Sequence, residues 1–295
     1  EAIRYVTDRP FPVVIKADGL ALGKGVVIAK TYDEADMTLR AFMQDAKFGK
    51  SGQTVVIEEF LEGNEISLHA FCDGETAVLF PVARDHKRVG DGNTGANTGG
   101  MGTIAPIDVS EAFLKDVTEK VVLPVLNGMK EKGQPFSGIL FPGLMVLKDG
   151  SYRVLEFNAR FGDPECESYM RLLESDIVDV MLACTEKKLG SATVSWSKRP
   201  VVTVILASGG YPDAYEKGFP ISGIAEAESD PDVVVFHAGT GDTGGAVVTA
   251  GGRVLAVSAV GDTKEIAKEK AYAAAGKIRF QGKQNRADVG AFWAL

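Results

Sequence analysis

Short apolar runs bounded by glycine, proline or acidic residues fill the first part of the chain. Runs of this kind predict strands, because they are too short for buried helices. They lie at residues 11–16, 25–30, 54–60 and 66–72. One amphipathic helix is expected at residues 32–44, with Thr31 as its N-cap and Asp33 and Glu34 in its first turn. The pattern predicts a small lobe that mixes strands and a helix.

The middle of the chain alternates between strands and helices, apart from one irregular stretch. Six of the thirteen residues 90–102 are glycine, which predicts a long mobile loop. Strands are expected at residues 77–83, 138–147 and 152–157, with a hairpin turn at 148–150, and helices at residues 110–132, opened by Ser110, and 164–188.

Near residue 192 the periodicity stops and polar residues gather, which is typical of a domain boundary. A separate α/β unit is expected beyond it, with strands at residues 201–207, 233–237, 246–249 and 253–260 and a helix at 263–277. The predicted domains are residues 1–66, 67–192 and 193–295.

Composition excludes several classes of protein. A net charge of −8 and a pI of about 5.1 disfavour a nucleic-acid partner, since neutralising phosphates requires a basic face. No apolar run is long enough to span a membrane. The cysteines, Cys72, Cys166 and Cys184, are odd in number and widely spaced, which favours a reducing compartment and a cytoplasmic protein.

The first chemical motif is VVIKADGLALGKGVVI. It places Lys16 at the end of a strand and Lys24 in a turn with Gly19, Gly23 and Gly25. Glycines let backbone amides approach phosphate oxygens, and lysines supply positive charge, so the segment fits a polyphosphate. It is not a Walker loop, because the glycine spacing differs and a strand follows. The alternative is an ordinary glycine hairpin with exposed lysines.

The second motif, VVIEEFLEGNEIS, is a strand that ends in acids. Strand alternation puts Glu58 and Phe60 on one face and Glu59 and Leu61 on the other. A nucleotide at this edge could bond its adenine to main chain near Phe60 and Leu61, with Glu65 accepting the ribose hydroxyls. The alternative is a solvated acidic edge strand.

The third motif, YRVLEFNARFGDPE, pairs a carboxylate with an amide. Glu156 and Asn158 are two residues apart on one strand and share a face, where their oxygens could bind magnesium. Arg160 continues that face and could hold a carboxylate or acyl phosphate. The apolar neighbours Val154 and Phe157 predict that the strand is buried. The alternative is a structural ion pair between Glu156 and Arg160.

In this order and spacing, Lys16, the loop around Lys24, EEFLEGNE and EFNARFGDPE resemble the ATP-grasp superfamily. Within it, IKADGLALGKGV, DHKRVGDGNTGANTGGMG, GLM and EFNARFGDPE resemble the glycinamide ribonucleotide synthetases, and ASGGYP, FHAGT and GGRVLAVSAVG extend the similarity to the last domain. The resemblance implies an α+β ATP-grasp fold, in which two α/β lobes enclose ATP, followed by a small carboxyl-terminal α/β domain.

The resemblance also assigns roles to residues. ATP contacts are implied for Lys16, Gly19, Gly23, Lys24, Gly25, Glu58, Glu59, Phe60, Leu61 and Glu65, and binding of magnesium or manganese for Glu156 and Asn158. Catalytic roles are implied for Arg160 and Asp163, which would face the glycine and acyl phosphate, and for Lys87. A substrate-proximal loop would contain Asp85, His86, Arg88, Asn97, Thr98, Gly99, Gly100 and Met101.

Two departures from the pattern matter. Gly143, Leu144 and Met145 stand where many ATP-grasp enzymes have another metal-binding carboxylate, so only Glu156 and Asn158 are named as ligands. The family also has an amino-terminal Rossmann-like domain that helps to bind phosphoribosylamine, and nothing here matches it. We therefore expect a segment upstream of Glu1, which begins inside a predicted helix.

The implied reaction is the ATP-dependent ligation of glycine to 5-phosphoribosylamine through glycyl phosphate, in purine synthesis. The partners are then small molecules, with no nucleic acid and no membrane, and the intact chain could be fused to other purine-pathway enzymes. Two alternatives stay open: an ATP-binding fragment that is inactive without its missing domain, and another ATP-grasp ligase that uses formate or bicarbonate. His69 and His237 lack zinc-like spacing and are expected to be structural.

Overall fold

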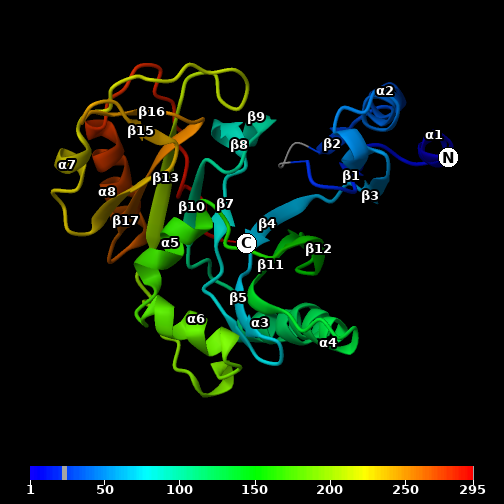
Figure 1. Cartoon of the computed structure of the whole chain (residues 1–295), viewed down its shortest axis with the longest axis horizontal. Helices are drawn as coiled ribbons and strands as arrows, with labels where there is room; N and C mark the ends of the chain where they lie inside the picture. The colour runs from blue at the N-terminus through cyan, green and yellow to red at the C-terminus, as the bar shows by residue number, and fades with distance from the viewer. Residues whose placement is uncertain (22–24, 295) are drawn as a thin grey trace. The chain divides into compact units, whose positions relative to one another are not determined.

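The computed structural model describes residues 1–21 and 25–294 (Figure 1). The chain divides into two compact units, Glu1–Gly63 and Asn64–Leu295. Within the described residues, no helix combines the length and apolarity needed to cross a lipid bilayer.

The first unit is a three-stranded antiparallel sheet, in the order β2-β1-β3, with helices packed on it. Its elements are α1 (Ala2–Thr7), β1 (Val13–Ala17), β2 (Val26–Ala29), α2 (Tyr32–Met43) and β3 (Val55–Glu59). Ile15 of β1 packs with Leu39 and Phe42 of α2 in a buried core. Thr31 caps α2 as predicted, since its hydroxyl accepts from the amide of Glu34 at 3.2 Å.

The second unit contains two larger sheets and two small ribbons. One sheet has the order β12-β11-β5-β6, with β4 also paired to β11, and the other has the order β14-β17-β13-β10-β7. The first is formed by β4 (Gly63–Ser67), β5 (Ala70–Asp73), β6 (Ala77–Leu79), β11 (Ser137–Leu147) and β12 (Tyr152–Asn158). The second is formed by β7 (Arg84–Asp85), β10 (Gly102–Ala105), β13 (Val201–Ala207), β14 (Val233–His237) and β17 (Arg253–Val260). The ribbons are β8 (Arg88–Gly90) with β9 (Thr94–Asn97), and β15 (Thr240–Asp242) with β16 (Val247–Thr249).

The helices of this unit are α3 (Glu111–Val117), α4 (Leu123–Glu131), α5 (Glu165–Leu172), α6 (Ile177–Thr185), α7 (Ile224–Ala227) and α8 (Lys264–Lys277). Every residue of β13 is buried. Helix α8 packs over β13 and β17 through a buried row of small residues that includes Ala267, Ala271 and Ala274 (Figure 1). Alanines at helical spacing let the helix approach the sheet closely, so this layer forms the centre of the unit.

The prediction of one strand at residues 66–72 is wrong, because two strands, β4 and β5, occupy it. Both pair with β11. Between them, the amide of Leu68 donates to the carbonyl of Pro142 in β11. Since Pro142 has no amide hydrogen to return a bond, the ladder cannot continue regularly past it.

The prediction of a structureless loop at residues 90–102 is also wrong. The segment forms the β8–β9 ribbon and leads into β10, which lies between β13 and β7 in the five-stranded sheet. The sequence did not predict these strands because they are separated by glycines in unusual backbone conformations. Gly92, Gly95 and Gly100 have φ values of +64°, +80° and +122°. Those conformations form tight turns between short strands, and periodicity does not detect them.

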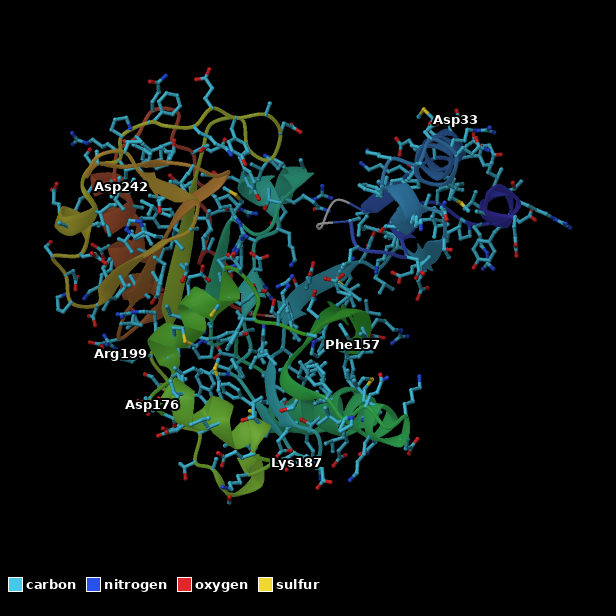
Figure 2. The ribbon with its side chains drawn as sticks, in the orientation of Figure 1. Asp33, Phe157, Asp176, Lys187, Arg199 and Asp242 are labelled. Atoms are coloured by element: carbon cyan, nitrogen blue, oxygen red, sulfur yellow. The ribbon has the colours of Figure 1, made fainter. Side chains whose placement is uncertain are left out.

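The helix predicted at residues 164–188 is two helices, α5 and α6. Asp176, labelled in Figure 2, is the N-cap of α6. Its carboxylate accepts a hydrogen bond from the amide of Val178 at 2.8 Å, which favours the start of a new helix at this point. The helix at residues 110–132 is present and Ser110 caps it, but a π turn at Thr118–Val122 interrupts it just before Pro124. Proline lacks the amide that a regular turn needs there.

Of the strands after residue 192, β13, β14 and β17 share a sheet with β7 and β10 from the middle of the chain. Residues 67–192 and 193–295 therefore belong to one compact unit. The division near residue 192 stays a prediction about separate domains.

Candidate active site

Lys16 lies in β1 of the first unit, next to a carboxylate of β3. Its Nζ is 2.6 Å from Glu58 Oε2, and the two side chains are 18% and 36% exposed. A pair this accessible adds little to stability, because water screens it. Its effect is to hold the lysine ammonium at the polar end of the sheet, where the sequence predicts phosphate contacts.

The glycine loop after β1 is described only at its ends, since Gly23 and Lys24 lie outside the described residues. The amide of Gly19 donates to the carbonyl of Ser51 at 3.1 Å, and a Cβ on Gly19 would lie 2.6 Å from the Ser51 Cβ. The carbonyl of Gly25 accepts from the amide of Ala17 at 2.8 Å. Close backbone packing thus requires glycine at position 19, whatever the loop binds.

The acidic end of β3 is open to solvent within the first unit. Glu59 is its last residue and is exposed. Phe60 follows with 36% of its surface accessible, and Leu61 is half-buried. Exposed aromatic surface beside main-chain groups is what an adenine ring would need, so these residues keep their predicted role as a proposal.

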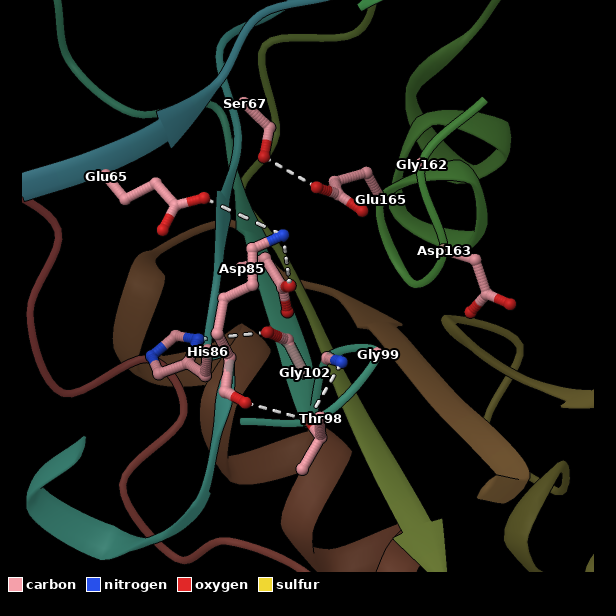
Figure 3. A network of polar contacts seen from close by, with 12 residues as sticks. Glu65, Ser67, Asp85, His86, Thr98, Gly99, Gly102, Gly162, Asp163 and Glu165 are labelled. Carbon is pink, nitrogen blue, oxygen red and sulfur yellow. Dashed lines mark hydrogen bonds and ion pairs between the residues drawn. The ribbon is translucent and has the colours of Figure 1, made fainter. Parts of the chain in front are cut away.

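In the second unit, the carboxyl groups of Glu65, Asp85 and Glu165 gather in one region (Figure 3), and Lys87 makes ionic contacts with the first two. Lys87 Nζ lies 3.3 Å from Asp85 Oδ2 and 3.7 Å from Glu65 Oε1. The third acid, Glu165, is buried and accepts from the Ser67 hydroxyl at 2.5 Å. Within the described residues, both Asp85 oxygens are buried without a hydrogen-bond partner, apart from the ionic contact with Lys87.

Burial and mutual repulsion shift the pKa values of this cluster. Burial raises the pKa of Asp85 to about 8, since Glu165 and Glu65 add to the effect and Lys87 only partly opposes it. The pKa of Glu65 is also raised, chiefly by burial. Burial lowers the pKa of Lys87, but Asp85 and Glu65 outweigh it and raise the net value, so Lys87 stays charged. The site combines a charged ammonium with the Asp85 carboxyl, whose raised pKa lets it exchange a proton near neutrality.

The predicted metal ligands meet on β12. The Asn158 amide donates to Glu156 Oε1 at 3.2 Å, and Arg160 donates to Asn158 Oδ1 at 3.4 Å and to the carbonyl of Phe161 at 2.8 Å. The prediction that this strand is buried is wrong. β12 is an edge strand, and Val154 and Phe157, the latter labelled in Figure 2, are 38% and 46% exposed.

An oxygen donor pair of this kind fits a hard divalent cation. Glu156 and Asn158 offer carboxylate and amide oxygens on one face, and such a cation completes its shell with water and phosphate oxygens. Among the described residues, no group of three or more His, Cys, Asp or Glu side chains is placed to hold a metal by itself.

The substrate-proximal loop divides into buried and accessible parts. His86 is buried, its Nδ1 lies 2.9 Å from the carbonyl of Gly102, and burial lowers its pKa to about 4. Met101 is fully buried beside Ile205 and Ala256. These two buried side chains therefore support the loop from inside.

The accessible part of the loop turns back on Lys87. The Thr98 hydroxyl donates to the carbonyl of Lys87 at 2.8 Å and accepts from the amide of Gly100 at 2.9 Å (Figure 3). Arg88 donates to the carbonyl of Gly95 at 2.8 Å, and Asn97 is exposed at the end of β9. The loop is thus folded against the lysine that it was predicted to accompany.

His69 holds the ARFGDP segment, residues 159–164, in place through a hydrogen bond. Its Nε2 accepts from the amide of Gly162 at 3.0 Å, and its Nδ1 lies 2.9 Å from the Tyr169 hydroxyl. The ring stacks on Phe141 at 4.0 Å and is fully buried, and burial lowers its pKa to about 3. A neutral structural histidine fits the prediction, while His237 is exposed and contacts Thr240.

The sequence did not single out the residues that bind these loops together. Arg253 of β17 donates to the carbonyls of Gly99 at 3.0 Å and Asp163 at 2.7 Å, and pairs with Asp163 Oδ2 at 3.0 Å. Tyr211 accepts from the amide of Gly99 at 3.1 Å. Their motifs, GGRVLAV and ASGGYP, were visible, but only the fold places them beside the site. Glu165, at the end of EFNARFGDPE, was also quoted without a role.

Comparison with known proteins accounts for this combination of motifs. Residues 1–166 match the family model described as the phosphoribosylglycinamide synthetase ATP-grasp (A) domain, and residues 201–292 match the model of its C domain. The chain belongs to the phosphoribosylglycinamide synthetase family. The acidic cluster, the predicted metal-ligand pair Glu156 and Asn158, and Lys16 of β1 all lie in the part that matches the ATP-grasp model of that family.

Relatives in this family are similar over nearly the whole chain. A phosphoribosylamine–glycine ligase of Vibrio vulnificus is 44% identical over 98% of this chain, which spans 67% of that protein. The chloroplastic ligase of Arabidopsis thaliana is 48% identical, and this chain spans 55% of its length. The crystal structure of the Thermotoga maritima ligase superposes with a TM-score of 0.87 at 39% identity, covering 97% of this chain and 71% of that one.

Two other matches show how far the similarity extends beyond single-function ligases of this family. A bifunctional purine biosynthetic protein of Pichia angusta is 43% identical, and the chain spans 36% of it. A biotin carboxylase domain from Hydrogenobacter thermophilus has a TM-score of 0.69 at 15% identity, a likeness of fold alone. The ATP-grasp fold is thus shared with enzymes outside the phosphoribosylglycinamide synthetase family.

Proposed function

We propose that the chain carries the ATP-grasp and carboxyl-terminal parts of a phosphoribosylamine–glycine ligase. The reaction joins glycine to 5-phosphoribosylamine at the expense of ATP and gives glycinamide ribonucleotide, ADP and phosphate. The observation that supports it most is the match of both family models in order, together with relatives of that name at 44% to 48% identity over 98% of the chain.

The chemistry proceeds in two displacements. A carboxylate oxygen of glycine attacks the γ-phosphorus of ATP, so that glycyl phosphate forms and ADP leaves. The amine of phosphoribosylamine then attacks the glycyl carbonyl carbon, phosphate leaves, and the amine loses a proton as the amide forms. Such phosphoryl and acyl transfers depend on in-line positioning and on neutralising charge, so no protein nucleophile is required.

The first unit supplies the nucleotide contacts in this proposal. Lys16, held by Glu58, neutralises phosphate charge, and the glycine loop from Gly19 to Gly25 covers the phosphates with backbone amides. Main-chain groups from Glu59 to Leu61 bond the adenine. Glu65, in the second unit and 3.7 Å from Lys87, accepts the ribose hydroxyls in this proposal.

The second unit supplies the metal ligands and the reacting end. Glu156 and Asn158 would hold a divalent cation, magnesium or manganese, which when bound offsets the charge of the ATP phosphates. Arg160 and Asp163 face glycine and the acyl phosphate. Lys87, kept charged beside Asp85, stabilises negative charge on the transferring groups.

A substrate panel tests the proposal. The whole protein, as its gene encodes it, is given MgATP with glycine plus phosphoribosylamine, with formate, or with bicarbonate, and phosphate release is measured. We expect release with the glycine pair alone. Turnover with formate or bicarbonate, and none with the glycine pair, would reject it. Calorimetry of ATP with and without magnesium on residues 1–295 tests the alternative of an inactive ATP-binding fragment, which predicts binding without turnover.

Fusion and location remain proposals as well. Because one relative is bifunctional, we include fusion to another purine-pathway enzyme in the proposal. We keep the cytoplasm as the proposed location, although one relative is named as chloroplastic. Sequencing the gene on both sides of this segment tests both points, since it would reveal a fused domain or a targeting peptide.

A further inference from the structure

Arg253 lies in the carboxyl-terminal part of the chain and contacts two loops of the ATP-grasp part. Its Nη1 donates to the carbonyls of Gly99 at 3.0 Å and Asp163 at 2.7 Å, and its Nη2 lies 3.0 Å from Asp163 Oδ2. The side chain is only 19% exposed. One guanidinium thus joins segments that are 90 and 154 residues away in sequence.

The first of these loops covers the buried carboxylate of the acidic cluster. A Cβ on Gly100 would lie 2.6 Å from Asp85 Oδ1, so this glycine sits directly against the carboxylate. A Cβ on Gly99 would lie 2.8 Å from the Arg253 Cζ, so the neighbouring glycine leaves room for the guanidinium. Side chains at positions 99 and 100 would collide with Arg253 and Asp85, so both positions of the turn require glycine.

The second loop begins helix α5 and positions Glu165. Asp163 and Pro164 precede the helix, and Glu165 is its first residue. A Cβ on Gly100 would also press on Pro164 Cδ, so the residue just before Glu165 packs on the same turn that covers Asp85. Arg253 therefore fixes the cover over Asp85 and the helix start that carries Glu165 at the same time.

We infer that Arg253 is a positioning residue for the ligation step, which it serves by clamping the Gly99–Gly100 turn and the Asp163 loop in one arrangement around the Asp85–Lys87 pair. The inference rests on the proposed function, and it assigns a role to a residue of the C domain outside the ATP-grasp part. The planar fork of arginine reaches two carbonyls and a carboxylate at once, whereas a lysine ammonium on a flexible stem would hold this geometry poorly.

The test compares Arg253→Met and Arg253→Lys with Arg199→Met in the whole protein. Arg199 is a matched control, because it also pairs with an aspartate of the second unit, Asp232 at 3.0 Å, and touches neither loop. We expect Arg253→Met to lower kcat for glycine ligation by about 100-fold while KM for ATP changes less than about twofold, since misplacing reacting groups by about 1 Å costs this much. Arg253→Lys should recover only part of the loss, and the control should keep kcat.

Amide hydrogen exchange gives a second readout that does not need activity. The amides of Gly99, Gly100 and Met101 donate to Tyr211, Thr98 and His86 and should exchange faster in Arg253→Met, but not in Arg199→Met. Unchanged exchange there, or an unchanged kcat in a folded Arg253→Met variant, overturns the inference. If the methionine variant does not fold, the same two measurements on Arg253→Lys decide. If the wild-type protein fails to ligate glycine, the proposed function is refuted instead. The exchange measurement still tests whether Arg253 holds the two loops together.

Discussion

Ser67 donates a hydrogen bond to Glu165 at 2.5 Å across 98 residues of sequence. The serine ends β4, the glutamate begins α5, and both are buried. A buried carboxylate needs such a donor, because removing it from water without one costs several kcal/mol. The bond ties the strand that carries Glu65 to the helix start beside Asp163.

Replacing Ser67 by alanine should therefore destabilise the second unit by about 1–3 kcal/mol, the range for stranding a buried acceptor. Urea unfolding at neutral pH measures it. Ser191→Ala is the matched control, since that hydroxyl also donates one bond, to the carbonyl of Lys188 at 3.0 Å, but is exposed. Equal effects of the two substitutions would contradict the importance given to burial.

Asn158→Ala should raise the magnesium concentration needed for half-maximal activity by about tenfold, because one of the two proposed oxygen ligands on β12 is lost. Arg153→Gln changes an exposed residue of the same strand, whose side chain bonds only its neighbour's carbonyl at 2.9 Å among the contacts described, and should leave the requirement unchanged. Initial rates at fixed ATP and varied free magnesium measure both. An unaltered requirement in Asn158→Ala would remove this residue from the proposed metal site.

Arg286 and Asp288 clasp the β8–β9 ribbon from the end of the chain. The guanidinium, 1% exposed, lies 2.6 Å from Asp288 Oδ2 and donates to Asn93 Oδ1 at 2.9 Å, and Asp288 accepts from the amide of Gly92. We expect Asp288→Asn to cost about 3–5 kcal/mol, because a buried cation loses its counter-ion. Unfolding in urea measures the loss.

The control is Arg199→Gln, which breaks the half-exposed pair of Arg199 and Asp232. It should lower the free energy of unfolding by less than about 1 kcal/mol.

The pair of Arg286 and Asp288 predicts an acid sensitivity with a definite sign. Arg286 holds the pKa of Asp288 far below its usual range. A carboxylate with a depressed folded pKa contributes stability that is present above its unfolded value, near 3.9, and is lost as the pH falls below it. Wild-type stability should therefore fall more steeply below about pH 4 than that of Asp288→Asn, as measured by urea midpoints at a series of pH values. Parallel curves would contradict the pairing.

His69 predicts a second loss of stability at mildly acidic pH. Its folded pKa is about 3, whereas an unfolded histidine titrates near 6.5. Since the unfolded chain then binds the extra proton, stability that is complete above pH 6.5 declines as the pH falls, by about 2 kcal/mol at pH 5. His69→Gln, which can still accept from Gly162, should reduce that slope. Unfolding midpoints at pH 7 and pH 5 test it, and an equal slope in both proteins would be the contrary result.

Local sequence patterns predicted the structure correctly where the stabilising contacts are between residues close in sequence. Thr31 and Ser110 cap the helices that they were predicted to cap, and the strand pair β11 and β12 lies where its alternation placed it. Glu156 and Asn158 meet on one face because two-residue spacing in a strand dictates it. The predictions failed where a distant partner decided the outcome. Pro142 of β11 breaks the strand at residues 66–72, and pairing with β13 turns part of a glycine-rich stretch into β10.

By itself, the sequence determined the order of the motifs, the family that they resemble and the residue types at the site, because these depend on neighbouring positions and on side-chain chemistry. Only the tertiary structure decided that His86 and Met101 point inward, that β12 is exposed, and that Arg253 reaches Asp163. Burial and long-range ion pairs are set by which segments pack together, and the free energy of that packing is distributed over contacts between residues far apart in the chain.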